Sequence, residues 1–219
     1  ALRAAASAIE DDLQAAGQAA PEGAFDVVLP GSGPSRLNVR AGLSSVETQS
    51  TGPLPITLTA SVPASLRVEA TTGFSTGKIV LVREGAAWIR ARVDSIATRT
   101  LRLTPSGATE PRSVTFNRAP TIALDEAVAI FYDAASRSVR RTTSGDTTDS
   151  ARPDWNPAND LAIHITFLRF QYFDELGAPL TLDTPANRAR VTAIAYTIGM
   201  EDRKSTRLNS SHVSESRMP

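Results

Sequence analysis

The sequence lacks cysteine and is poor in histidine, and these two absences remove much of the usual catalytic chemistry. Its 219 residues include no Cys and only 2 His. Disulfides, thiolate nucleophiles and cysteine-ligated metal sites are therefore excluded. Two histidines also supply few ligands for a zinc site and few bases for Ser–His catalysis, because both depend on histidine. We expect no enzyme activity and no cofactor.

Positive and negative charges balance, and long apolar runs are absent. Lys+Arg 23 balance Asp+Glu 23, which argues against a general nucleic-acid binder or a basic membrane-surface protein. The chain contains no run of about 18 apolar residues, the length that a membrane-spanning helix requires. With 41% hydrophobic residues it can still bury a core, so we expect one domain or a small pair.

The first residues have the pattern of a helix with one apolar stripe. Spacings of three and four separate the apolar residues Leu2, Ala5, Ala6, Ile9, Leu13 and Ala16. Gly17 stands where a helix C-cap is expected, and Pro21 follows as a stop. The spacing predicts a helix over residues 1–16. We interpret residues 1–20 as the C-terminal part of a longer spine helix, since the pattern begins without a start signal.

After Pro21 the apolar spacing changes to that of strands. Short segments rich in Val, Ile, Thr and Leu alternate with Gly and Pro turn signals; they are residues 25–29, 56–60, 66–70, 79–82, 88–96, 100–104, 114–116, 128–132, 162–172 and 191–200. Residues 21–201 are therefore predicted to form a mainly antiparallel β domain. The predicted fold class is α+β, with the N-terminal helix packed on the sheet.

Alternation within two strands predicts which side chains face the core. Ile89, Ala91 and Val93 share one face, which leaves Arg90 and Arg92 toward solvent. In the last predicted strand the inward residues are Ile194, Tyr196, Ile198 and Met200. His164 alternates with two isoleucines and is interpreted as a strand residue rather than a catalytic one.

Clusters of carboxylates offer only weak candidate sites. Glu10–Asp12 lies on an exposed helix face, and Asp174–Glu175 precedes Leu176–Gly177 in a predicted hairpin turn. A carboxylate pair of a hydrolase stays open as the least favoured alternative. Residues 142–159 are predicted to be a long exposed loop anchored by Trp155. Its carboxylates could gather around Ca²⁺, although a plain hydrophilic loop is the simpler interpretation; they are Asp146, Asp149, Asp154 and Asp160.

Two stretches resemble type IV pilin-like proteins. Asp12-Leu13-Gln14-Ala15-Ala16-Gly17 is similar to the exit of their long N-terminal helix. The segment around Phe170, Tyr172, Phe173, Asp174 and Gly177 resembles the Phe-x-Tyr-Phe-Asp-x-x-Gly hairpin of minor pilins and of the J-type minor pseudopilins of type II secretion. Residues 190–200 resemble the strand that follows this hairpin, and residues 128–141 the segment before it.

The resemblance implies a pilin-like fold and a non-enzymatic role in a type IV pilus or type II secretion pseudopilus. Leu2, Ala5, Ala6, Ile9, Leu13 and Ala16 are the predicted subunit-packing face of the helix. The expected partners are other pilin-like subunits and, through an N-terminal helix missing here, the bacterial inner membrane, with the β domain periplasmic or extracellular. No nucleic acid is expected as a direct partner. The alternative is a secreted β-rich ligand-binding or adhesion module.

The last residues differ in composition from the rest of the chain. Residues 202–219 contain no Ala and carry one of the two lysines and one of the two histidines. Asp202 to His212 resemble the in-frame translation of a common short-read sequencing adapter. We therefore expect residues 202–219 to be an artefactual, disordered tail and leave them out of the functional argument.

Overall fold

The computed structural model describes residues 2–18, 26–106, 113–147, 153–200 and 211–217. Within these ranges the helices are α1 (Leu2–Ala15) and α2 (Pro185–Ala189). The strands are β1 (Arg36–Arg40), β2 (Glu47–Gln49), β3 (Ile56–Thr59), β4 (Ala64–Arg67), β5 (Ile79–Glu84), β6 (Ala87–Ala97), β7 (Thr100–Pro105), β8 (Ser113–Phe116), β9 (Thr121–Leu124), β10 (Ala127–Asp133), β11 (Ser138–Ser144), β12 (Asn159–Ile163), β13 (Ile165–Phe173), β14 (Pro179–Leu180), β15 (Ala193–Met200) and β16 (Ser211–Arg217).

The predicted α+β, pilin-like fold class is wrong. About 50% of the described residues lie in strands and about 10% in helices, and the strands pair antiparallel, so the fold is β-rich. The prediction fails because of where the strands from β2 to β9 pack. They do not extend a sheet beside the first helix but form a separate unit around a core of their own.

One unit, which we call the body, combines α1 with two four-stranded sheets. The sheet orders are β1-β10-β11-β12 and β14-β13-β15-β16. The apolar faces of both sheets and of α1 meet in one core, in which Ile9, Leu13, Ile130, Phe170 and Tyr196 are at most 2% exposed. Alternating apolar residues on each strand account for this arrangement, because every second side chain points to the same face.

The second unit is a closed β-barrel. Its six strands follow the order β2-β9-β5-β6-β7-β4. The first and last strands of this order are joined by the bridge Ser50↔Val68, and the backbone N–H of Thr51 donates to the carbonyl of Arg67 at 2.8 Å. The two-stranded ribbon β3-β8 adds Leu58 and Phe116 to the barrel core. Closure leaves the six-stranded sheet without a free edge strand.

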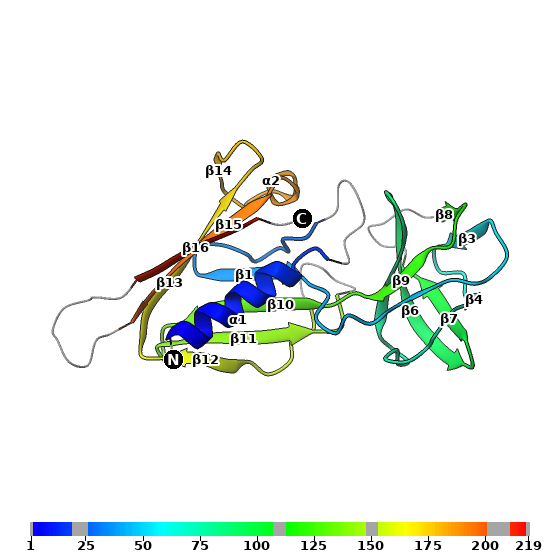
Figure 1. The fold of residues 1–219 in the computed structure, drawn as a ribbon, viewed down its shortest axis with the longest axis horizontal. Coiled ribbons are helices and arrows are strands. Elements are labelled where there is room, and N and C mark those ends of the chain that lie inside the picture. The colour runs from blue at the N-terminus through cyan, green and yellow to red at the C-terminus, as the bar shows by residue number, and fades with distance from the viewer. Residues whose placement is uncertain (1, 19–25, 107–112, 148–152, 201–210, 218–219) are drawn as a thin grey trace.

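The barrel is inserted into the body between two neighbouring strands. β1 and β10 pair along Arg36–Arg40, yet the whole barrel separates them in the sequence. Figure 1 shows the consequence: the body, with α1 lying over its sheet, occupies one end of an elongated molecule and the barrel occupies the other. The predicted β domain over residues 21–201 therefore contains two separate hydrophobic cores.

Several local predictions are confirmed. The predicted helix is present as α1, and Gly17 follows it with φ +76°, the left-handed conformation of a C-cap. Ile89, Ala91 and Val93 are fully buried. Ile194, Tyr196 and Ile198 also face the core of the body.

Other local predictions are corrected. The single strand predicted over residues 162–172 is divided, because His164 adopts φ +63° between β12 and β13. His164 is thus a junction residue and not a strand residue. Residues 142–159 are also not uniformly an exposed loop: Thr142, Ser144 and Thr147 are buried.

Neither of the helices that the structure describes is long and apolar enough to cross a membrane. The expected tail is only partly described, as the backbone of β16, which pairs antiparallel with β15 from Ser211 to Arg217. The adapter interpretation of residues 202–219 stays a prediction.

Candidate functional site

The apolar face of α1 points into the chain's own core. The predicted subunit-packing residues that are at most 4% exposed are Ala5, Ala6, Ile9, Leu13 and Ala16, and Leu2 packs against the same core. Side chains enclosed by their own chain cannot contact a neighbouring subunit. The assignment of these residues to a subunit-packing face is therefore wrong. The surface that α1 offers to a partner consists of its exposed residues Arg3, Ala4, Ser7, Asp11 and Gln14.

Two polar contacts fix α1 on the body. The carboxylate of Asp12 accepts hydrogen bonds from Nε and Nη2 of Arg141 on β11, both at 2.7 Å. This pairing raises the pKa of Arg141. The hydroxyl of Tyr196 on β15 donates to the carbonyl of Ala6 at 3.3 Å and contacts Oε1 of Glu10 at 3.2 Å. Both sheets thus hold the helix at specific positions, in addition to the apolar contact.

The hairpin motif forms the turn between β13 and β14. The backbone N–H of Asp174 donates to the carbonyl of Ala178, and the Asp174 carboxylate accepts the N–H groups of Leu176 and Ala178. Gly177 has φ +76°, which glycine adopts at no steric cost. The prediction of a hairpin turn at Asp174–Gly177 is confirmed, and the Asp174 carboxylate stabilises this turn through its backbone N–H groups.

The electrostatics of this turn favour an ionised Asp174. The hydrogen bond from Ala178, the one from Leu176 and the nearby guanidinium of Arg190, whose Nη2 lies 2.7 Å from Oδ2, lower the pKa of Asp174. Leu176 at the tip of the turn is 91% exposed. The result is a rigid hairpin that presents one apolar side chain to solvent.

The aromatic residues of the motif lie on β13 and have different environments. Phe170 and Tyr172 are buried in the body core, and Phe173 is half-buried. The Tyr172 hydroxyl donates to the carbonyl of Gly33 at 3.0 Å and lies 3.2 Å from that of Arg36, and its burial raises its pKa. Tyr172 therefore connects the two sheets of the body as a neutral hydrogen-bond donor.

A buried charged cluster, which the sequence did not reveal, joins the body to the barrel. Nη1 of Arg40, at the end of β1, lies 2.6 Å from both carboxylate oxygens of Asp125. Nε of Arg90 on β6 lies 2.8 Å from Oδ2 of the same carboxylate, and the hydroxyl of Thr147 donates to it. All four residues are at most 5% exposed. The only sequence signals were charged residues inside apolar strand patterns, and the prediction that Arg90 faces solvent is wrong.

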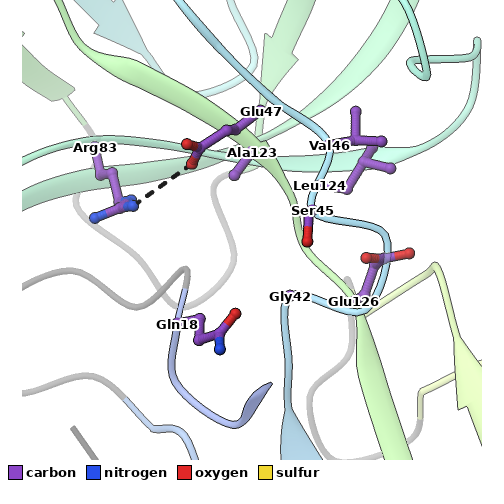
Figure 2. A pocket seen from close by; sticks show the side chains of 9 residues that line it. All are labelled: Gln18, Gly42, Ser45, Val46, Glu47, Arg83, Ala123, Leu124 and Glu126. Carbon is purple, nitrogen blue, oxygen red and sulfur yellow. Dashed lines mark ion pairs between the residues drawn. The ribbon is translucent and has the colours of Figure 1, made fainter. Parts of the chain in front are cut away.

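A polar pocket lies next to this junction. Figure 2 shows its lining residues, which come from the end of α1, the strand connections and the barrel edge: Gln18, Gly42, Ser45, Val46, Glu47, Arg83, Ala123, Leu124 and Glu126. The pocket has a volume of about 290 Å³. Arg83 and Glu47 are 4.0 Å apart, and Glu126 accepts hydrogen bonds from the N–H and hydroxyl of Ser44. The pairing within the lining is loose, because Nε of Arg83 is buried without a hydrogen-bond partner among the described residues and Glu126 is bonded to Ser44 outside the lining.

Of the acidic residues proposed for Ca²⁺, Asp160 has its carboxylate held by other side chains. Asp160 lies 3.2 Å from Nε of Arg140 and accepts a hydrogen bond from Ser138. The backbone N–H of Asp154 donates to the carbonyl of Asp146, whereas Asp149 lies outside the described residues. The part of the chain that the structure describes brings together no group of three metal-ligating side chains. Trp155, the predicted anchor of this segment, packs against Arg36, whose guanidinium carbon is 5.8 Å from the Trp155 ring centroid.

Comparisons with known proteins add no family to this description. Neither the protein-family models nor the curated proteins provide a match for this chain.

Proposed function

We propose that this chain is a non-enzymatic minor pilin or pseudopilin subunit of an envelope filament, a type IV pilus or a type II secretion pseudopilus. The proposal rests on the two stretches that resemble those proteins and on what their residues do here. Asp12 anchors α1 to the body, and Gly17 follows the end of this helix. Asp174 and Gly177 build a rigid hairpin far away in the sequence. Both stretches belong to the body and border a single hydrophobic core.

The contacts of α1 are the observation that carries the proposal. A bidentate ion pair, one tyrosine hydroxyl and a continuous apolar face hold a 14-residue helix on the body. In a filament subunit, a helix fixed in this way would connect an N-terminal anchor to the β-rich units. Its outward face, with Arg3, Ser7 and Asp11, stays accessible to neighbouring subunits. This arrangement suits a subunit that is anchored by its N-terminal side and presents its β units away from the anchor.

The experiment is recovery and expression of the complete gene. The proposal requires an upstream leader with a prepilin peptidase site and an apolar helix that continues into α1. Co-expression with a prepilin peptidase is expected to shorten the protein at that site, and an inactive peptidase is the control. A complete gene whose product is exported by an ordinary signal peptide, or is not processed at all, contradicts the proposal.

The second candidate function is that of a secreted ligand-binding or adhesion module. The observation that favours it is the barrel, which has its own hydrophobic core and its own six-stranded sheet. Under this alternative the body is a support for the barrel. The same gene recovery separates the two, because the alternative predicts a conventional signal peptide or another domain upstream.

A further inference from the structure

Seven arginines of the described residues form ion pairs with carboxylates, whereas three neighbouring arginines on the barrel do not. Ion pairs involve Arg40, Arg83, Arg90, Arg92, Arg140, Arg141 and Arg190. By contrast, Arg67, Arg99 and Arg102 are exposed, and the described residues place no carboxylate in ion-pair contact with any of them. The chain as a whole has a net charge of zero, so this is a local excess of positive charge.

The three arginines, which we call the arginine face, occupy neighbouring positions on the barrel. Arg67 on β4 lies opposite Thr100 on β7, and Arg102 lies opposite Ser65. Arg67 and Arg102 are therefore diagonal neighbours across two strands, a separation of about 7–8 Å. Arg99 precedes Thr100 in the turn between β6 and β7 and accepts the N–H of Val68 with its carbonyl.

Alternation along both strands keeps Arg67 and Arg102 outward, and Arg99 in the adjoining turn is also exposed. Leu66, Leu101 and Leu103 point into the barrel core and are at most 5% exposed, so the residues between them point to solvent. The side chains that separate the arginines on β4 and β7 are the hydroxyls of Ser65 and Thr100. Figure 1 shows that β4 and β7 lie at the end of the molecule away from the body.

We propose that the arginine face binds an acidic polysaccharide. Guanidinium groups bind sulfate and carboxylate oxygens through paired hydrogen bonds, and exposed Ser and Thr hydroxyls can accept or donate hydrogen bonds to sugar hydroxyls. An exposed strand face with cations about 7–8 Å apart fits successive anionic groups of a polymer better than one small anion. The inference is independent of the proposed filament function.

Other polyanions fit this face less well. Proteins that bind single-stranded nucleic acids combine a basic groove with aromatic side chains for stacking. The outward positions of β4 and β7 carry only Ser, Thr and Arg. Duplex binders usually have a strongly basic domain or stripe, whereas here Glu69 follows β4 and Asp94 neutralises Arg92 on the adjacent strand. A small cluster of cations surrounded by hydroxyls is more suited to a polysaccharide, whose sugar hydroxyls can form hydrogen bonds with the neighbouring Ser and Thr side chains.

The test measures binding of the full chain to heparin, a sulfated polysaccharide, and to hyaluronan, which carries carboxylates alone. The test variant combines Arg67→Gln, Arg99→Gln and Arg102→Gln. The matched control combines Lys78→Gln, Arg118→Gln and Arg169→Gln, which removes the same charge from exposed positions elsewhere. We expect salt-sensitive binding of at least one polysaccharide, about tenfold weaker in the test variant and unchanged in the control.

A second variant separates the shape of the guanidinium from its charge. Arg67→Lys with Arg102→Lys keeps the charge but loses the paired hydrogen bonds, so an intermediate affinity is expected. Unfolding midpoints equal to that of the wild type show that all variants are folded. The proposal is overturned if neither polysaccharide binds at low salt, or if the control loses as much affinity as the test variant. It is likewise overturned if duplex DNA binds to the same arginines more tightly than either polysaccharide.

Discussion

Removal of the Asp125 carboxylate is the most informative perturbation of the junction between body and barrel. This carboxylate contacts Nη1 of Arg40 at 2.6 Å and Nε of Arg90 at 2.8 Å, and it accepts the hydroxyl of Thr147. Both guanidiniums are nearly inaccessible to water, with side chains 4% and 7% exposed. Removal of one partner from a buried ion pair costs about 3–5 kcal/mol, because the remaining charges stay desolvated.

Asp125→Ala is therefore expected to lower the free energy of unfolding by about 3–5 kcal/mol, a large part of the 5–15 kcal/mol typical of native proteins. Asp125→Asn keeps the volume and an acceptor for Thr147, so a smaller loss is expected. Equilibrium unfolding in urea measures both. Glu47→Ala is the control, since its ion pair with Arg83 spans 4.0 Å at an exposed position and should contribute less than about 1 kcal/mol. A loss at Asp125 no larger than that at Glu47 refutes the reasoning.

Three further predictions concern the helix, one turn and the hairpin. Asp12→Ala removes two charge-assisted hydrogen bonds and is expected to cost about 1.5–3 kcal/mol in urea unfolding, whereas Asp11→Ala on the exposed face should change stability by less than about 0.5 kcal/mol. Gly73→Ala is expected to destabilise more than Gly77→Ala: both positions have φ +87°, but only at Gly73 does an added Cβ meet Val46, at 2.6 Å, so equal losses would count against steric contact. Because the folded-state pKa of Asp174 lies below its usual value of 3.8, the ionised carboxylate stabilises the fold above that pH, and this stability is lost as the pH falls through the lowered pKa. The difference in unfolding midpoint between wild type and Asp174→Asn should thus be largest near neutral pH and shrink below about pH 4, and a difference independent of pH would contradict the assignment.

Local patterns in the sequence predicted the elements but not the way they combine. The spacing from Leu2 to Ala16 depends only on neighbouring residues, and it correctly predicts a helix with one buried face. Pairing of Ser50 with Val68, which closes the barrel, and of β1 with β10 depends on distant contacts. No local pattern encodes these contacts, which explains why two units were predicted as one sheet packed under a helix.

The residues of the candidate site were predictable to a similar extent. The turn at Asp174–Gly177 follows from residue types that favour turns, and the structure contains it. Alternation along β6 correctly separates Ile89 from Arg90, but it does not show that Asp125 covers the outer face of that strand. The apolar face of α1 was likewise correct as a pattern, although a pattern does not distinguish contact with another subunit from contact with the chain's own core.

Cross-linking from α1 in the assembled, full-length protein tests the central claim most directly. The chain has no native Cys, so Ser7→Cys on the exposed helix face and Thr57→Cys on the barrel ribbon each introduce a single reactive thiol. If the chain is a filament subunit, a short thiol-to-amine cross-linker should join position 7, and not position 57, to another pilin-like protein in purified filaments. Absence of the chain from such filaments, or equal cross-linking from both positions, would contradict the account.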